Sequence, residues 1–155
     1  MKAYLKIIFQ FLILLTSFNQ YAQHQSKMKV ELNAANKTLA IKQEIIFVNQ
    51  SDDTLNSIVL NDWNHAFSNK NTPLAKRFSD EFYRGFHLAK EEERGSTINL
   101  IINDATQQFL SWERTDNNPD YIVVKLKNSL LPNQKVVLHL SYITKIPSDK
   151  FTKYG

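Results

Sequence analysis

Cysteine is absent from this 155-residue sequence, and glycine occurs only three times. The absence of cysteine excludes a disulfide framework, a thiolate zinc site, a cysteine nucleophile and a lipid-modified cysteine near the amino end. Three glycines leave almost no material for a glycine-rich loop that binds phosphate. The excess of positive charge is also small. The formal net charge is +4, and two lysines, Lys2 and Lys6, lie in a segment that we expect to be removed. The remaining positive charge is too small to indicate nucleic acid as a partner.

The composition that is present is typical of one globular domain, with 43% hydrophobic and 22% charged residues. A chain of this length buries roughly two-thirds of the surface that it exposes when unfolded, so one core suffices to stabilise it. No repeat and no proline-rich linker divides the sequence. We therefore expect a single folded domain after any leader segment.

The first residues have the pattern of an export signal. Two lysines flank the start of an apolar run over 7–18, and Ala22 supplies a small residue at a cleavage point. We therefore predict a signal peptide over 1–22 and a mature domain over 23–155, exported to the periplasm, the cell surface or the medium. A membrane anchor is the competing interpretation, but the run of 12 residues is shorter than the ~20 needed to span a bilayer. We expect no stable membrane span.

Beyond this segment the sequence alternates polar and apolar residues with a period of two, which predicts β-strands. The first two stretches are joined by a loop of hairpin length over 33–37, so they should be antiparallel neighbours. Further turns are expected at 49–53, 117–120 and 131–134. About seven short strands predict a mainly β fold, an antiparallel β-sandwich or saddle-like sheet with one inserted helix. The predicted strands cover 28–32, 39–47, 55–60, 97–102, 109–112, 122–126 and 136–142.

One apolar face of these strands should be buried in the core. The alternation selects one set of side chains for this face. The residues expected to be mainly buried are Met28, Val30, Ile41, Ile45, Phe47, Ile58, Leu60, Leu100, Ile122, Val124, Leu126, Leu138 and Leu140.

One stretch departs from the strand period and predicts a helix over 73–84. Thr72 can act as N-cap and Pro73 suits the first helical position. Apolar residues then recur every four positions, at Leu74, Phe78, Phe82 and Phe86. This stripe carries more apolar area than one face of a short helix needs, so we expect the chain to expose an apolar surface for a missing neighbour and to aggregate or associate when it is produced alone.

The four histidines do not form a recognisable metal motif. None of His24, His65, His87 and His139 begins an HExxH sequence. His87 and Glu91 are four residues apart, but two ligands without a third are a weak indication of a metal site, and we interpret them as a helix-surface pair. His139 alternates with apolar strand residues and is expected on the solvent side.

Other candidate catalytic groups are no stronger. The carboxylates of Asp52–Asp53 and Asp80–Glu81 are adjacent, and adjacent side chains point apart on a strand or helix, so we expect turn and surface positions. The serines at Ser57, Ser79 and Ser141 lack the glycine-flanked sharp turn of an exposed nucleophile. We assign no catalytic, cofactor-binding or metal-ligating residue to this chain.

Aromatic residues make up 12% of the sequence, which raises the hypothesis of a carbohydrate-binding surface. The candidate stacking platforms are Trp63, Trp112, Phe82, Tyr83 and Phe86. Aromatic side chains are used more often to fill a core between sheet and helix, and we favour that interpretation.

Nine phrases that follow one another in order along the chain resemble a known family. They lie at 30–32, 39–49, 46–55, 60–64, 71–78, 86–90, 119–124, 130–132 and 146–155. In this order they resemble the amino-terminal domain of aminopeptidase N type zinc metallopeptidases, the gluzincins, particularly the exported bacterial versions. The resemblance covers nearly all of the mature chain, and its specificity comes from the order of the phrases and from the closing one.

The resemblance implies that this chain is the non-catalytic β domain of an exported zinc aminopeptidase. In that family the zinc ligands and the catalytic glutamate belong to a later helical domain, and the segment that holds the free amino group of the substrate also follows the position of Gly155. No catalytic position can be carried over. The chain then resembles an incomplete piece whose partner is the missing catalytic domain of the same polypeptide, with zinc in that domain and a peptide substrate reached through the parent enzyme.

A second hypothesis stays open, namely a stand-alone exported β-sandwich that binds a glycan or a protein. The coding sequence after Gly155 would separate the two, because an HExxH motif supports the first and a stop codon supports the second. Under the first hypothesis the chain by itself should have no peptidase activity and no tight zinc site.

Overall fold

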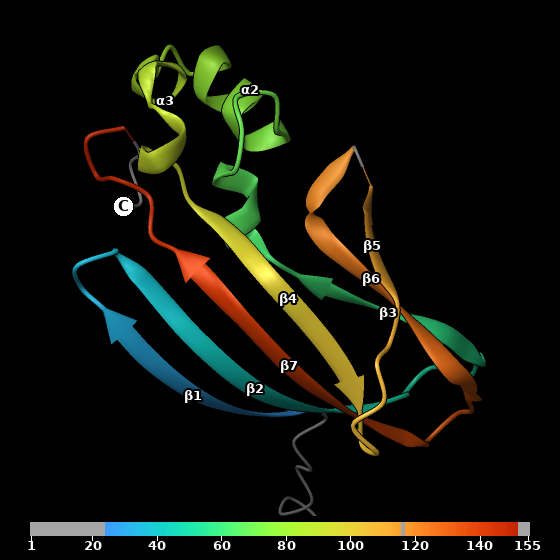
Figure 1. Cartoon of the computed structure of the whole chain (residues 1–155). Helices are drawn as coiled ribbons and strands as arrows, with labels where there is room; N and C mark the ends of the chain where they lie inside the picture. The colour runs from blue at the N-terminus through green and yellow to red at the C-terminus, as the bar shows by residue number, and fades with distance from the viewer. Residues whose placement is uncertain (1–23, 116, 152–155) are drawn as a thin grey trace, which may run out of the picture.

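The computed structural model describes residues 24–115 and 117–151, and these form seven strands and a group of short helices (Figure 1). The predicted signal peptide over 1–22 and the end of the closing phrase over 152–155 lie outside the described residues. The elements in chain order are β1 (Gln25–Asn33), β2 (Thr38–Val48), β3 (Leu55–Asn61), η1 (Trp63–Phe67), α2 (Pro73–Asp80), α3 (Gly85–Leu88), η2 (Glu91–Glu93), β4 (Ser96–Asp104), β5 (Trp112–Thr115), β6 (Asn118–Leu130) and β7 (Lys135–Lys145).

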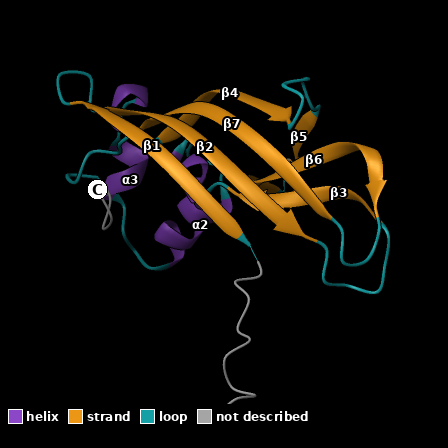
Figure 2. Cartoon of the chain, turned by 90° about the horizontal axis from the view of Figure 1, so that it is seen from below, coloured by secondary structure: helices purple, strands orange, loops and turns teal. Residues whose placement is uncertain are grey.

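The strands form two antiparallel sheets that pack face to face like a sandwich, as the alternation predicts. The four-stranded sheet has the order β1-β2-β7-β4, and the three-stranded sheet has the order β3-β6-β5. Figure 2 shows the long strands of the first sheet lying side by side, with the helices gathered at one end. The mainly β, antiparallel fold with a short helical insertion is therefore confirmed.

The main core lies between the sheets. It is formed by buried aliphatic side chains from both sheets and from the loop between β4 and β5, namely Ile58, Ile102, Leu110, Ile122, Val124, Leu138 and Leu140. Of the predicted core residues, Ile41 is buried as well, whereas Ile45, Phe47, Leu60, Leu100 and Leu126 are partly buried and pack against this cluster.

Two residues predicted to be buried are exposed. Met28 is 52% exposed and Val30 is 47% exposed, because both lie on β1 at the edge of the four-stranded sheet. They share the inner face with Gln43 and Ile41, their partners on β2. The three-stranded sheet packs over the other strands and leaves this part of the inner face uncovered (Figure 1). The period was interpreted correctly, and the prediction of burial was wrong.

The predicted helix begins where expected and ends earlier. Thr72 Oγ1 accepts a hydrogen bond from the backbone N–H of Ala75 at 3.2 Å, so α2 begins at Pro73. The predicted end at Arg84 is wrong, because α2 ends at Asp80 and Phe82 adopts a left-handed backbone with φ of 58°. That turn removes Phe82 from the apolar stripe. The other three members, Leu74, Phe78 and Phe86, are buried in the insert, so the expectation that the stripe forms an exposed contact surface was wrong except at Phe82.

The helical insert, defined here as 63–93, has a small core of its own. Phe67, Phe78 and Phe86 form a cluster of rings, with centroids 5.5 to 6.4 Å apart. The smaller Ala66, Leu74 and Ala75 complete it, and Tyr83 packs against it. The insert is therefore held as a unit on one end of the sandwich (Figure 1).

Two predicted boundaries were also wrong. Phe109 forms only an isolated bridge with Asn103, and β5 begins at Trp112. The turn predicted over 117–120 is shorter, because β6 already begins at Asn118 and its Pro119 lies within the strand.

Candidate functional site

The strongest polar cluster surrounds Asp62, at the junction of β3 and the helical insert. Asp62 forms an ion pair with Arg114 of β5, and its other carboxylate oxygen accepts a hydrogen bond from Thr97 Oγ1 of β4 at 2.6 Å. The backbone N–H of Asp62 donates to the carbonyl oxygen of Asp120 at 2.6 Å. One carboxylate thus ties together both sheets and the start of the insert.

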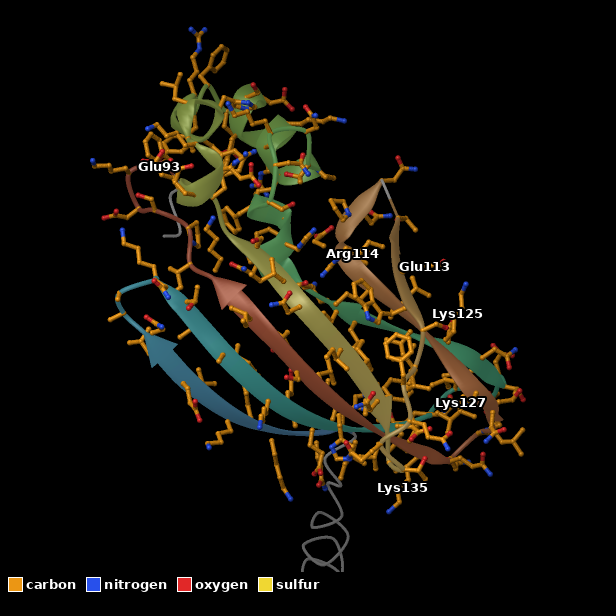
Figure 3. The ribbon with its side chains drawn as sticks, in the orientation of Figure 1. Glu93, Glu113, Arg114, Lys125, Lys127 and Lys135 are labelled. Carbon is orange, nitrogen blue, oxygen red and sulfur yellow. The ribbon has the colours of Figure 1, made fainter. Side chains whose placement is uncertain are left out.

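Arg114 is held on three sides. Its second terminal nitrogen donates to the carbonyl oxygen of Pro119 at 3.0 Å, and its guanidinium carbon lies 5.6 Å from the centre of the Trp112 ring. Figure 3 shows Arg114 on β5, close to the insert. Because both oxygens of Asp62 are engaged, we interpret this cluster as a structural joint and not as a free general base.

A cavity of about 220 Å³ lies beside this joint, between the two sheets. Its polar rim includes Tyr142, whose hydroxyl donates to Gln43 Oε1 at 3.0 Å. Burial raises the pKa of the Tyr142 phenol, and the negative charge of Asp62 adds to this effect. The tyrosine is therefore a neutral hydrogen-bonding group at ordinary pH. The lining residues are Gln43, Ile45, Leu60, Asn61, Asp62, Thr97, Leu100, Ile122, Leu140 and Tyr142.

His65 is the histidine nearest to this joint. Burial lowers the pKa of its imidazole, and the Arg114 guanidinium lowers it further, against the opposing effects of Asp62 and a hydrogen bond to the Thr97 backbone. Its Nδ1 atom is buried, with no hydrogen-bond partner among the described residues. His65 is thus favoured in its neutral form.

The other three histidines lie apart from it. His24 stacks on Phe47 at a centroid distance of 4.7 Å, and His139 lies on the outer face of the four-stranded sheet, with Nδ1 3.9 Å from Glu44. His87 contacts the carbonyl oxygen of Ala75 at 3.0 Å and so joins α3 to α2. Over 24–115 and 117–151, no group of three or more histidine, aspartate or glutamate side chains could hold a metal ion.

The interpretation of His87 and Glu91 as a pair on one helix was wrong. The helix α3 ends at Leu88, and Glu91 begins the separate η2. Ala89 and Lys90 between them have extended backbone conformations, so the i, i+4 spacing has no helical meaning here.

The carboxylate pairs and the serines lie on the surface. Asp52 and Asp53 are exposed in the turn after β2, and Glu81 forms an ion pair of 2.9 Å with Arg77, four residues earlier. The side chains of Ser57, Ser79 and Ser141 are exposed as well.

The aromatic candidates divide between core and surface. Phe86 is fully buried, Tyr83 packs against Phe78 at 5.4 Å, and Trp112 packs against the main core. Trp63 is 51% exposed and Phe82 is 84% exposed. The core interpretation therefore holds for three of the five, and the two exposed rings both belong to the helical insert.

Phe82 combines two unfavourable features. Its φ of 58° is a conformation that suits glycine, and its large apolar side chain points into solvent. A large apolar side chain that its own domain leaves uncovered is a candidate for contact with something else.

Asn49 is a structural residue that the sequence analysis placed only in a turn. It is buried, and its side-chain amide donates to the carbonyl oxygens of Asp53 at 2.8 Å and Leu130 at 2.9 Å. Its Oδ1 accepts from the hydroxyl of Ser51 at 2.8 Å. An asparagine with a serine two positions later is a known local signal for such a turn, but the contact with Leu130 depends on the tertiary fold.

Two further findings bear on function. In the part of the chain that the structure describes, no helix is long and apolar enough to cross a membrane. No protein-family model matches the chain, and no curated protein matches it significantly.

Proposed function

We propose that this chain is the non-catalytic amino-terminal domain of an exported zinc aminopeptidase. In this proposal it packs against the catalytic domain of the same polypeptide and forms one wall of the substrate cleft. The parent would hydrolyse peptides from the amino end. The ordered set of phrases that ends in 146–155 supports the family, and the sandwich with a helical insert is compatible with it.

The observation that carries the proposal is the exposed ring of Phe82. A bulky residue in a left-handed conformation costs free energy, and here the ring recovers almost none of it by burial within the domain. Packing against a second domain would bury the ring and offset that cost. Phe82 is therefore the expected anchor of the contact.

The helical insert exposes two other apolar side chains. Trp63 lies at the start of the insert and Leu88 at the end of α3, and both are exposed. Aromatic anchors surrounded by smaller apolar contacts are typical of protein interfaces. We therefore assign the contact with the catalytic domain to the helical insert.

The proposal gives zinc no part in the chemistry of this chain. The four histidines lie on four different elements or loops, and each described contact holds one of them separately. A hydrolytic zinc site needs three converging ligands and an open position. In this proposal the metal belongs to the catalytic domain.

The coding sequence after Gly155 gives the first test. An HExxH motif within the next few hundred codons, followed by a distal glutamate, is the expected result. A stop codon directly after Gly155 would contradict the proposal and favour the stand-alone sandwich.

A binding experiment gives the second test. The chain and the segment that follows it are produced separately, and their affinity is measured by calorimetry. Phe82→Gly should weaken binding by about tenfold or more, since anchor residues contribute on the order of 2 kcal/mol. Phe109→Ala is the matched control, because Phe109 is another exposed phenylalanine, outside the insert. Equal effects of the two variants would refute the assigned surface.

A further inference from the structure

Among residues 24–115 and 117–151, no strand pairs with the outer edge of β1. Strand β1 pairs with β2 on one side only and forms the end of the four-stranded sheet. Its nine residues are all exposed, its register with β2 is continuous, and it contains no proline. Proteins normally protect such an edge with a bulge, a proline, charged side chains or covering structure, because unpaired backbone groups accept another strand. Of these protections, β1 has only its charged side chains, Lys27, Lys29 and Glu31.

The two faces of β1 have different chemistry. Met28, Val30 and Leu32 lie on the inner face, opposite Gln43, Ile41 and Leu39 of β2. Leu32 is 66% exposed, so all three apolar side chains lie open beyond the cover of the three-stranded sheet. The outer face carries Lys27, Lys29 and Glu31, and Lys29 lies 3.0 Å from Glu31.

We propose that a second copy of this chain pairs with β1, antiparallel and edge to edge, about a twofold axis through Val30. In this register Val30 faces Val30 of the other copy, and Met28 faces Leu32 twice. On the outer face Lys29 faces Glu31 twice, and Lys27 faces Asn33. Cross-strand neighbours of opposite charge and of apolar character both stabilise a sheet.

Neighbouring registers lack this self-complementarity. An axis through Lys29 places two Lys29 side chains opposite each other, and an axis through Glu31 does the same with two carboxylates. An axis through Met28 places Lys27 opposite Lys29. A shift by one residue places apolar side chains opposite charged ones, because side chains alternate between the two faces. The sequence of β1 thus selects Val30 as the centre.

The paired copies would share one eight-stranded sheet. The apolar strips of the two inner faces would meet along the axis and cover each other's exposed side chains. The helical insert remains free in this arrangement, because η1 packs near β4 and β6, away from β1 (Figure 1). The inference therefore does not depend on the proposed contact between Phe82 and a catalytic domain.

Charge exchange tests this pairing in the chain purified after export. The wild-type chain should dimerise at micromolar concentration in sedimentation equilibrium. Lys29→Glu places two carboxylates opposite each other at both symmetric contacts, and Glu31→Lys does the same with ammonium groups. Each single variant should raise the dimer Kd by about tenfold or more. The variant with both substitutions restores opposite charges and should dimerise like the wild type.

Mixing gives the most specific result. The Lys29→Glu chain and the Glu31→Lys chain should associate with each other, although each alone is mainly monomeric. Lys135→Glu is the control for net charge, because Lys135 is exposed and is the first residue of β7, a strand that β2 separates from β1 (Figure 3). A monomeric wild type, a dimer that the single variants leave unchanged, or a double variant that fails to recover would each overturn the proposal.

Discussion

The backbone N–H of Tyr83 donates to the carbonyl oxygen of Phe78 at 2.7 Å, and the rings of these two residues lie 5.4 Å apart. Phe82 N–H donates to the carbonyl oxygen of Ser79 at 3.0 Å. These contacts form a Schellman motif at the end of α2, with Phe82 in the position that glycine usually occupies. The motif closes the helix and directs Tyr83 back onto the core of the insert.

Phe82→Gly should therefore stabilise the domain while it removes an apolar side chain. The left-handed conformation costs a residue with a Cβ about 1 kcal/mol, and the exposed ring contributes little burial in return. We expect the free energy of unfolding in urea to rise by about 0.5–1 kcal/mol. Phe82→Ala is the control, because it removes the ring but keeps the Cβ, and should not give this gain. A loss of stability in Phe82→Gly would show that the ring is needed inside the domain.

Arg114→Met should destabilise the domain strongly. Side chains of the Asp62–Arg114 pair are only 10% and 14% exposed, so the substitution leaves a nearly buried carboxylate without its cation. Breaking such a pair costs about 3 kcal/mol. The double variant Asp62→Asn with Arg114→Met should recover part of this loss, because no unpaired charge remains. Urea unfolding of the wild type, the two single variants and the double variant measures the coupling energy between the two side chains. An additive result would contradict the assigned joint.

Asp104 should make stability sensitive to acid. The Thr106 hydroxyl, then the backbone N–H of Gln108, lower the pKa of Asp104 from 3.8 to about 2. Because the folded pKa lies below the unfolded one, this contribution is fully present above about pH 4 and is lost as pH falls through about 2.

The measurement is the urea midpoint between pH 5 and pH 2. Asp104→Asn should show a smaller decrease over this interval than the wild type. Thr106→Val retains the carboxylate but removes the hydroxyl donor, which lies 2.7 Å from Asp104 Oδ1. It should therefore give an intermediate decrease. Identical curves for all three proteins would rule out this contribution of Asp104.

Local signals were sufficient for most of the strands and for the start of the helix. Alternation across Ile122, Val124 and Leu126 reflects a pleat with one buried face, and this period is the main local signal of a half-buried strand. Thr72 and Pro73 specify the start of α2 through contacts within a few residues. The end of α2 could not be predicted from the sequence. The residue in the left-handed position after the helix is Phe82, and not the glycine that usually marks a helix end.

The candidate site was less accessible to sequence reasoning. Asp62, Thr97 and Arg114 are distant in the chain, and no spacing rule connects them. Their contacts exist because β3, β4 and β5 meet at one end of the sandwich. Neither the pKa of His65 nor the cavity beside Asp62 can be inferred before that packing is known.

The sequence by itself determined which side chains share a face, since the period of two assigns Met28 and Val30 to the same side as Ile41. Only the tertiary structure decided which part of that face is buried. The three-stranded sheet covers Leu138 and Leu140 at the centre of the four-stranded sheet and does not reach β1 at its edge. Alternation encodes direction relative to the backbone, whereas burial depends on what packs against each face, and all nine residues of β1 remain exposed.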